Sequence, residues 1–321
     1  MPEQAPLISA PGAPAPEGGQ AEWFSGAGGA RLRAAIFPTG GAALGSVVVS
    51  PGRTEPIEKY FETVGDLNAR GFAVLVHDWR GQGLSQRLLR DRLAGHAAGY
   101  KDFLADYQSL LDVFETRLPQ PWIALGHSMG GCLTLLALAT GEGRFSGAML
   151  SSPMLGIATG TMPARAARAL ARLQTVFGRG GTAAQSSGNA TAGPTPFEDN
   201  VLTHDRRRYE RNLALFEACP DLALGGPTWG WVEFAFSAIG VLQRGPGTAS
   251  IRIPVTIAAA SDEKLVDNNG LRVVVGRLPG ARLVEIPGAF HEILQETDEV
   301  RAMFWREFDA LVARSGVTYS L

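Results

Sequence analysis

Gly126-His127-Ser128-Met129-Gly130 is the stretch of sequence that decides the fold. An apolar segment of strand length leads directly into it, and an apolar segment of helix length follows it. A serine with a glycine two positions away on either side, in this strand–turn–helix context, is typical of a nucleophile elbow. Ser128 is therefore the candidate nucleophile. The backbone N–H of Met129, at the helix N-terminus, is a candidate hydrogen-bond donor to an oxyanion.

Strands and helices alternate on both sides of this turn. Short apolar runs bounded by polar residues or glycine have the length of buried strands, and segments between them have helical spacing. The expected strands are 31–38, 46–50, 72–78, 122–125, 148–150, 254–259 and 282–286. This alternation predicts an α/β fold with a mostly parallel central sheet and helices on both faces.

The alternation is interrupted once, which suggests how the chain is divided. Residues 26–152 and 252–321 are expected to form the core, and residues 153–251 a helical cap between two parts of one sheet. Such a cap covers a ligand site at the carboxyl edge of the strands. A Gly-, Ala-, Ser- and Thr-rich stretch near 178–194 is expected to be a flexible loop. Residues 1–25, rich in Pro, Ala and Gly, are expected to form a disordered tail.

A serine hydroxyl is a poor nucleophile until a base takes its proton, so a histidine is required. His291 follows the last expected strand, and the chain order serine, acid, histidine is the one that accompanies this kind of elbow. His291 is therefore the expected base. The other histidines are expected to be structural, to line a pocket or to lie in loops: His77, His96, His127 and His204.

The acid that orients the histidine is expected just after the strand that resumes the sheet. Asp262 and Glu263 both lie there, and a carboxylate of either length can orient an imidazole and stabilise its cation. Glu263 is favoured because it has the usual position of the acid, nine residues after Pro254 and shortly before Leu265-Val266. Asp262 remains the alternative.

The loop after the expected strand at 46–50 should supply a second oxyanion donor. It reads Ser50-Pro51-Gly52-Arg53-Thr54-Glu55, so the backbone N–H of Arg53 is the candidate, together with that of Met129. The loop 78–85 contains a Gly-x-Gly but lacks the third glycine and the later acidic residue of a dinucleotide-binding loop. It is expected to be a tight structural loop beside the site.

In these motifs the chain resembles the bacterial lysophospholipase and monoacylglycerol lipase branch of the α/β-hydrolase superfamily. The resemblance runs from about Ala30 to the C-terminus. It rests on Gly52–Glu55 with Tyr60, Asp78–Ser85, Gly126–Gly131, Asn200–Asp205, Gly225–Trp231 and Gly288–Glu292. It implies an α/β-hydrolase fold and a Ser-His-acid triad that hydrolyses the carboxylic ester of lysophospholipids or monoacylglycerols, without a metal or an organic cofactor.

Other functions on the same fold stay open. They are a short-acyl esterase, a thioesterase, a prolyl aminopeptidase and a non-catalytic binding module. The complete set of serine, histidine and acid argues against the binding module, because such relatives usually lack one member. Within the expected cap, the aromatic residues Trp229, Trp231, Phe234 and Phe236 are candidates for lining an acyl-chain tunnel, although packing of the cap on the core explains them equally well. Arg206-Arg207-Arg208 could meet a phosphate or simply begin a solvated helix.

Composition narrows the partners and the location. The net charge of −2 provides no basic surface for nucleic acid. The two cysteines are too few for a disulfide scaffold and lack metal-site spacing. No segment has the ~18–20 apolar residues that a membrane span needs, and the N-terminus has no signal-peptide pattern. The sequence predicts a cytoplasmic protein with a lipid-like ester substrate and peripheral contact with the inner face of the membrane through the cap.

Overall fold

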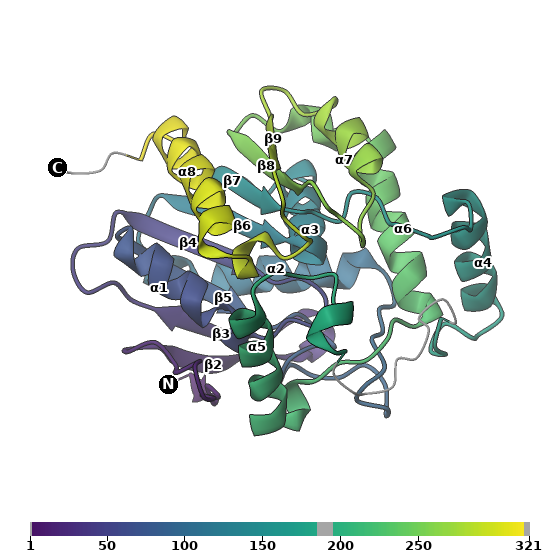
Figure 1. The fold of residues 1–321 in the computed structure, drawn as a ribbon, viewed down its shortest axis with the longest axis horizontal. Coiled ribbons are helices and arrows are strands. Elements are labelled where there is room, and N and C mark those ends of the chain that lie inside the picture. The colour runs from purple at the N-terminus through teal and green to yellow at the C-terminus, as the bar shows by residue number, and fades with distance from the viewer. Residues whose placement is uncertain (1, 185–194, 318–321) are drawn as a thin grey trace.

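One mixed sheet organises the molecule (Figure 1). The computed structural model describes residues 2–184 and 195–317. Within these residues, nine strands form a sheet in the order β1-β2-β3-β5-β4-β6-β7-β8-β9. The pairs from β5 through β4, β6, β7 and β8 to β9 are parallel, whereas β1, β2, β3 and β5 pair antiparallel. The expected α/β class with a mostly parallel sheet is confirmed.

The strands agree closely with the apolar runs of the sequence. Their bounds are β1 Glu3–Gln4, β2 Gln20–Ser25, β3 Arg31–Phe37, β4 Gly45–Ser50, β5 Phe72–His77, β6 Trp122–His127, β7 Phe145–Ser151, β8 Val255–Ala260 and β9 Arg282–Ile286. The three central strands β4, β5 and β6 are buried along their whole length. A strand buried on both faces is mostly apolar, which is why these segments show no regular alternation of polar and apolar residues.

Helices cover both faces of the sheet. Their bounds are α1 Phe61–Ala69, α2 Tyr100–Phe114, α3 Ser128–Ala139, α4 Ala164–Val176, α5 Arg206–Ala218, α6 Trp229–Arg244, α7 Asn268–Val275 and α8 Asp298–Arg314. Figure 1 shows α1 and α8 on the face toward the viewer, and their apolar side chains form one core with that face. Helices α2, α3, α6 and α7 supply a second core on the other face. The nucleophile turn lies between β6 and α3.

The N-terminal segment differs from expectation, because residues 1–25 were expected to be a disordered tail. Instead, β1 pairs with β2, and β2 pairs antiparallel with β3 over six residues. Ala21 and Phe24 are buried, and the carbonyl of Pro6 accepts a hydrogen bond from Arg33 at 2.9 Å. Composition reports local apolar content only, whereas this segment gains its order from a partner strand reached through the fold.

The interval between β7 and β8 contains α4, α5 and α6. Asp205 caps α5 and Thr228 caps α6 through their side-chain oxygens. Helix α6 also packs on the core, where Phe234 stacks on Phe103 of α2 at 4.9 Å. Of the expected loop at 178–194, residues 185–194 lie outside the described residues. Just before them, the carbonyl of Thr182 accepts a hydrogen bond of 3.0 Å from the backbone N–H of Trp229.

In the described part of the chain, no helix is both long and apolar enough to cross a bilayer. In the same residues, no group of three or more His, Cys, Asp or Glu side chains is placed to hold a metal ion.

Candidate active site

Ser128 lies on a strained turn at the start of α3. Its φ is +49°, a conformation that a residue with a side chain adopts only where the surrounding structure imposes it. The glycines around it allow the close packing that imposes it. A Cβ on Gly126 would lie 2.7 Å from the Cα of Gly131, and one on Gly130 would collide with the carbonyl of Ser50 at the end of β4. The elbow therefore holds Ser128 in this strained conformation at the first position of α3 and brings α3 against the β4 loop.

Three side chains form a hydrogen-bonded line from this serine. The Nε2 atom of His291 lies 2.9 Å from the Oγ atom of Ser128, and the Nδ1 atom of His291 lies 2.7 Å from an oxygen of Glu263. Glu263 stands after β8 and His291 after β9, at the same edge of the sheet as Ser128. This is the geometry that a base needs to take the serine proton and that an acid needs to orient the base.

Glu263, and not Asp262, is the carboxylate that meets His291. Its second oxygen accepts backbone hydrogen bonds from Lys264 and Leu265 at 2.9 and 2.7 Å. Burial acts to raise the pKa of Glu263, but the hydrogen bond and charge of His291 and these backbone N–H groups outweigh it and hold the pKa below its ordinary value. The carboxylate is therefore ionised. Asp262 is exposed and accepts a hydrogen bond from Ser261 instead.

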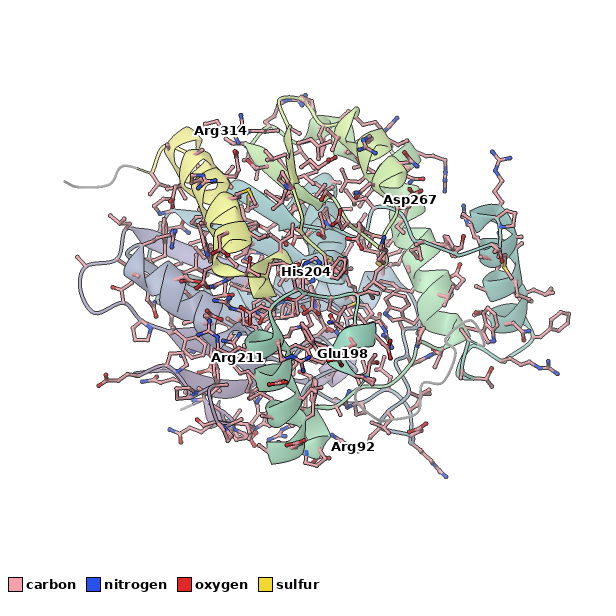
Figure 2. The ribbon with its side chains drawn as sticks, in the orientation of Figure 1. Arg92, Glu198, His204, Arg211, Asp267 and Arg314 are labelled. Atoms are coloured by element: carbon pink, nitrogen blue, oxygen red, sulfur yellow. The ribbon has the colours of Figure 1, made fainter. Side chains whose placement is uncertain are left out.

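The loop that carries His291 is tied to the segment just before α5. The backbone N–H of Glu292 donates a 2.9 Å hydrogen bond to the carbonyl of Leu202, just before α5. His204, labelled in Figure 2, stacks on Phe290 with ring centroids 3.8 Å apart. His204 therefore contacts the site only indirectly, by packing on Phe290, the residue that precedes His291.

The β4 loop holds a backbone N–H free beside the elbow. The N–H of Gly52 donates to Glu55 at 2.5 Å, and the N–H of Thr54 donates to the side chain of Gln82 at 2.7 Å. The indole of Trp79 donates to the carbonyl of Pro51 at 2.8 Å. Between these fixed points, the backbone N–H of Arg53 has no hydrogen-bond partner among the described residues. The loop 78–85 thus acts as a structural clamp on the segment expected to hold the oxyanion.

A buried cluster of charges lies under this loop, and the sequence analysis did not find it. Lys59 donates to Glu55 at 2.8 Å and to Glu292 at 2.5 Å, and the hydroxyl of Tyr60 donates to Glu55 at 2.5 Å. Burial acts to raise the pKa of Glu55, but Lys59 above all lowers it to about 2. Burial lowers the pKa of His127 to about 4, so this histidine is neutral at pH 7. The only sequence signal was the clustering of charged residues at 55–59, which alone resembles an ordinary solvated helix start.

The aromatic residues expected to line an acyl-chain tunnel differ in whether they lie beside the nucleophile turn. Trp231, together with Met129 and Gly95, lines a narrow gap that is too small to hold a water molecule. Phe234 is fully buried and Phe236 almost so, and both pack in the protein interior. Trp229 is partly exposed at the start of α6 and does not line this space.

Two of the three arginines at 206–208 are paired with carboxylates. Arg208 is buried and pairs with three carboxylates, those of Glu62, Asp205 and Asp298. Arg206 pairs with two exposed glutamates, Glu198 and Glu210. Neither of these two arginines therefore presents an unpaired charge, whereas Arg207 is exposed and makes no ion pair with the described residues.

Comparison with known proteins places the chain in a family. The model of the family described as serine aminopeptidase, S33, matches residues 41–298. The chain is also 36% identical to lysophospholipase L2 of Escherichia coli over 270 residues, which are 80% of this chain and 77% of that protein. The chain belongs to the lysophospholipase and monoacylglycerol lipase branch of the α/β-hydrolases.

Other members of this α/β-hydrolase branch resemble the chain over most of its length. A monoacylglycerol lipase of Mycolicibacterium smegmatis is 26% identical over 86% of this chain and 91% of that protein. Among solved structures, a soluble variant of the monoglyceride lipase of Saccharomyces cerevisiae, in complex with a substrate analog, superposes with a TM-score of 0.71. That structure covers 97% of both chains at 18% identity and shows the shared fold.

Proposed function

We propose that this α/β-hydrolase cleaves the carboxylic ester of a single-chain lipid, a lysophospholipid or a monoacylglycerol, through an acyl-enzyme on Ser128. The hydrogen-bonded line from Ser128 through His291 to Glu263, in a chain whose relatives are named for these lipid substrates, carries the proposal. The family description also names an aminopeptidase. Hydrolysis of prolyl amides is therefore the second candidate.

The proposed reaction has two steps. His291 takes the proton of Ser128 as its oxygen attacks the ester carbonyl, and the backbone N–H groups of Arg53 and Met129 bind the negative oxygen that forms. His291 then gives the proton to the departing alcohol. Water attacks the acyl-enzyme with His291 again acting as base, and the fatty acid leaves. Throughout, the ionised carboxylate of Glu263 stabilises the histidine cation.

We assign the role of a cap to residues 153–251, with the acyl chain running between cap and core. Met129, a proposed oxyanion donor, and Trp231 line the same narrow gap, which would have to widen to admit the chain, and their adjacency supports this path. Each methylene transferred from water is worth ~0.8 kcal/mol, so a long chain should be favoured over a short one. Trp231 is the stronger candidate for a chain contact, and Trp229 is retained as a contact nearer the surface.

Peripheral contact with a membrane at the cytoplasmic face is the second part of this proposal. It is supported by α4, which lies at the edge of the molecule (Figure 1) and leaves Val176 and Phe177 73% and 71% exposed. Arg165, Arg168 and Arg172 lie on the same helix. Exposed apolar residues beside arginines favour an anionic lipid surface. Val176→Ser with Phe177→Ser should weaken sedimentation with anionic vesicles, and unchanged sedimentation would contradict the contact.

A substrate panel tests the function. The specificity constant kcat/KM should be measured for p-nitrophenyl esters of two to sixteen carbons, for lysophosphatidylcholine, for monoolein and for a prolyl amide. The proposal predicts that long single-chain lipids exceed the acetate and butyrate esters. A profile that peaks at acetate without lipid turnover would leave a short-acyl esterase, and dominant prolyl-amide turnover would establish the aminopeptidase.

A further inference from the structure

The guanidinium of Arg53 carries a charge that no carboxylate of the described residues compensates. Its Nε atom is buried without a hydrogen-bond partner, and one Nη atom donates to the carbonyl of Gly225. By contrast, the deeply buried Arg33 and Arg208 each pair with two or more carboxylates. Burial lowers the pKa of Arg53 to about 10, so the group still carries its charge at neutral pH. Burying a cation without an anion raises the free energy of the folded protein. An anionic ligand bound beside the cation would offset this cost.

The position of this charge is fixed from three sides. The guanidinium lies 5.3 Å from the ring centre of Trp231 and packs on Gly95, where an added Cβ would stand 2.7 Å from an Nη atom. Only glycine at position 95 leaves room for it. Gly95 and Trp231 also line the narrow gap beside Met129, which is the residue that follows Ser128 in the chain. Arg53 as a whole is partly exposed, and its second Nη atom, unlike Nε, is not a buried atom without a partner, so a ligand can reach the guanidinium from that side.

The backbone and the side chain of Arg53 would then act on two parts of one substrate. Its backbone N–H is the proposed donor to the oxyanion, and its guanidinium lies one arginine side chain away. In a lysophospholipid, the glycerol unit separates the ester carbonyl from the phosphate by a comparable span. Guanidinium groups bind phosphate oxygens through paired, charge-assisted hydrogen bonds.

We propose that the side chain of Arg53 binds the phosphate of a lysophospholipid head group while the ester carbonyl lies at Ser128. This assignment rests on the proposed function and sharpens it, because a monoacylglycerol offers no phosphate. Arg53 is then a specificity-determining residue. The enzyme then has a higher kcat/KM for lysophospholipids than for monoacylglycerols of the same acyl chain.

The test compares two substrates with the same ester and the same chain, palmitoyl lysophosphatidylcholine and monopalmitoylglycerol, in the same mixed micelles. The quantity is the ratio of their kcat/KM values, which cancels any effect of a substitution on the shared oxyanion step. Arg53→Met should lower this ratio by about tenfold or more, and Arg53→Lys should lower it less. An unchanged ratio in Arg53→Met would overturn the assignment.

Arg87 provides a matched control. It also joins core to cap, through hydrogen bonds to the carbonyls of Asp221 and Ala223 at 2.8 and 2.9 Å. Arg87→Met should therefore loosen the cap without removing the proposed phosphate contact, and the substrate ratio should stay within about twofold of wild type. A fall equal to that of Arg53→Met would show that cap packing, and not phosphate binding, sets the ratio, and would overturn the assignment.

A measurement on the wild-type enzyme covers the case in which the variant does not fold. Glycerophosphocholine should inhibit p-nitrophenyl ester hydrolysis competitively and more strongly than either glycerol or inorganic phosphate. Inhibition no stronger than that by glycerol, or weaker than that by inorganic phosphate, would overturn the head-group assignment. Turnover of neither lipid by the wild-type enzyme would contradict the proposed function itself, which separates the two failures.

Discussion

The side-chain oxygen of Gln82 accepts a 2.7 Å hydrogen bond from the backbone N–H of Thr54. This contact joins the loop after β5 to the loop after β4. Thr54 has a φ of +68°, which is strained for a residue with a side chain, and the bond to Gln82 helps to hold it there. The preceding residue is Arg53, whose backbone N–H is the proposed oxyanion donor. Gln82 is therefore a positioning residue for a step in which it does not itself take part.

Gln82→Ala should lower kcat for ester hydrolysis by about tenfold and leave KM nearly unchanged, because the oxyanion forms only in the transition state. Gln86→Ala is the matched control. Gln86 lies in the same part of the chain and accepts a backbone hydrogen bond from exposed Arg31 at 3.0 Å, away from Thr54. If both variants lose the same activity, Gln82 acts through general stability, and the positioning role is wrong.

The two neighbouring carboxylates after β8 should differ sharply in their effect. Glu263→Gln should reduce kcat at least about 100-fold, because the amide cannot stabilise the cation of His291. Asp262→Asn should keep kcat within about threefold of wild type, since that side chain is exposed. Steady-state kinetics with one p-nitrophenyl ester are sufficient. The reverse order of the two effects would transfer the role of the acid to Asp262.

The elbow and the alternation of elements could be predicted from the sequence because both are local. Apolar runs report burial directly, and the glycines at 126 and 130 report close backbone approach. Between Asp262 and Glu263 the sequence left an alternative, since neighbouring side chains after a strand point in different directions and only the fold selects one.

The features that the sequence analysis missed depend on contacts between distant segments. β2 is ordered by pairing with β3, so the composition of residues 1–25 was misleading. The ion pairs of Arg208 require Glu62, which lies far away in the chain. The guanidinium of Arg53 is likewise enclosed by residues far away in the chain, Gly225 and Trp231. Long-range packing of this kind leaves no periodic signal in a single sequence.

Acid sensitivity should arise partly from His77. Burial lowers its pKa to about 3 from an ordinary value of 6.5. Between these pH values the unfolded chain binds a proton that the folded protein does not, so this contribution to stability is complete above pH 6.5 and decreases as the pH falls. Each such histidine adds up to about 1.4 kcal/mol per pH unit to the slope of the free energy of unfolding against pH.

His77→Gln should therefore show a shallower fall of the free energy of unfolding between pH 6 and 4 than the wild-type protein, measured by urea denaturation. His127, whose pKa is about 4, should supply most of the slope that remains. Parallel curves for the variant and the wild type would mean that His77 is protonated in the folded protein, contrary to its buried position.

Ser128→Ala should lower kcat for every ester by at least ~10³, while the thermal unfolding temperature stays close to that of the wild type. The remaining rate would come from substrate binding and the oxyanion donors alone. Near wild-type hydrolysis in this variant would remove Ser128 from the mechanism.

The central claim is that a lipid acyl group passes through a covalent ester on Ser128. The most direct measurement mixes the enzyme with palmitoyl lysophosphatidylcholine, stops the reaction with acid within milliseconds and maps the acyl group by peptide mass spectrometry. The account predicts one palmitoyl group on the peptide that contains Ser128 in the wild-type enzyme, and none in Ser128→Ala. A palmitoyl group on another residue, or continued release of palmitate by Ser128→Ala, would contradict it.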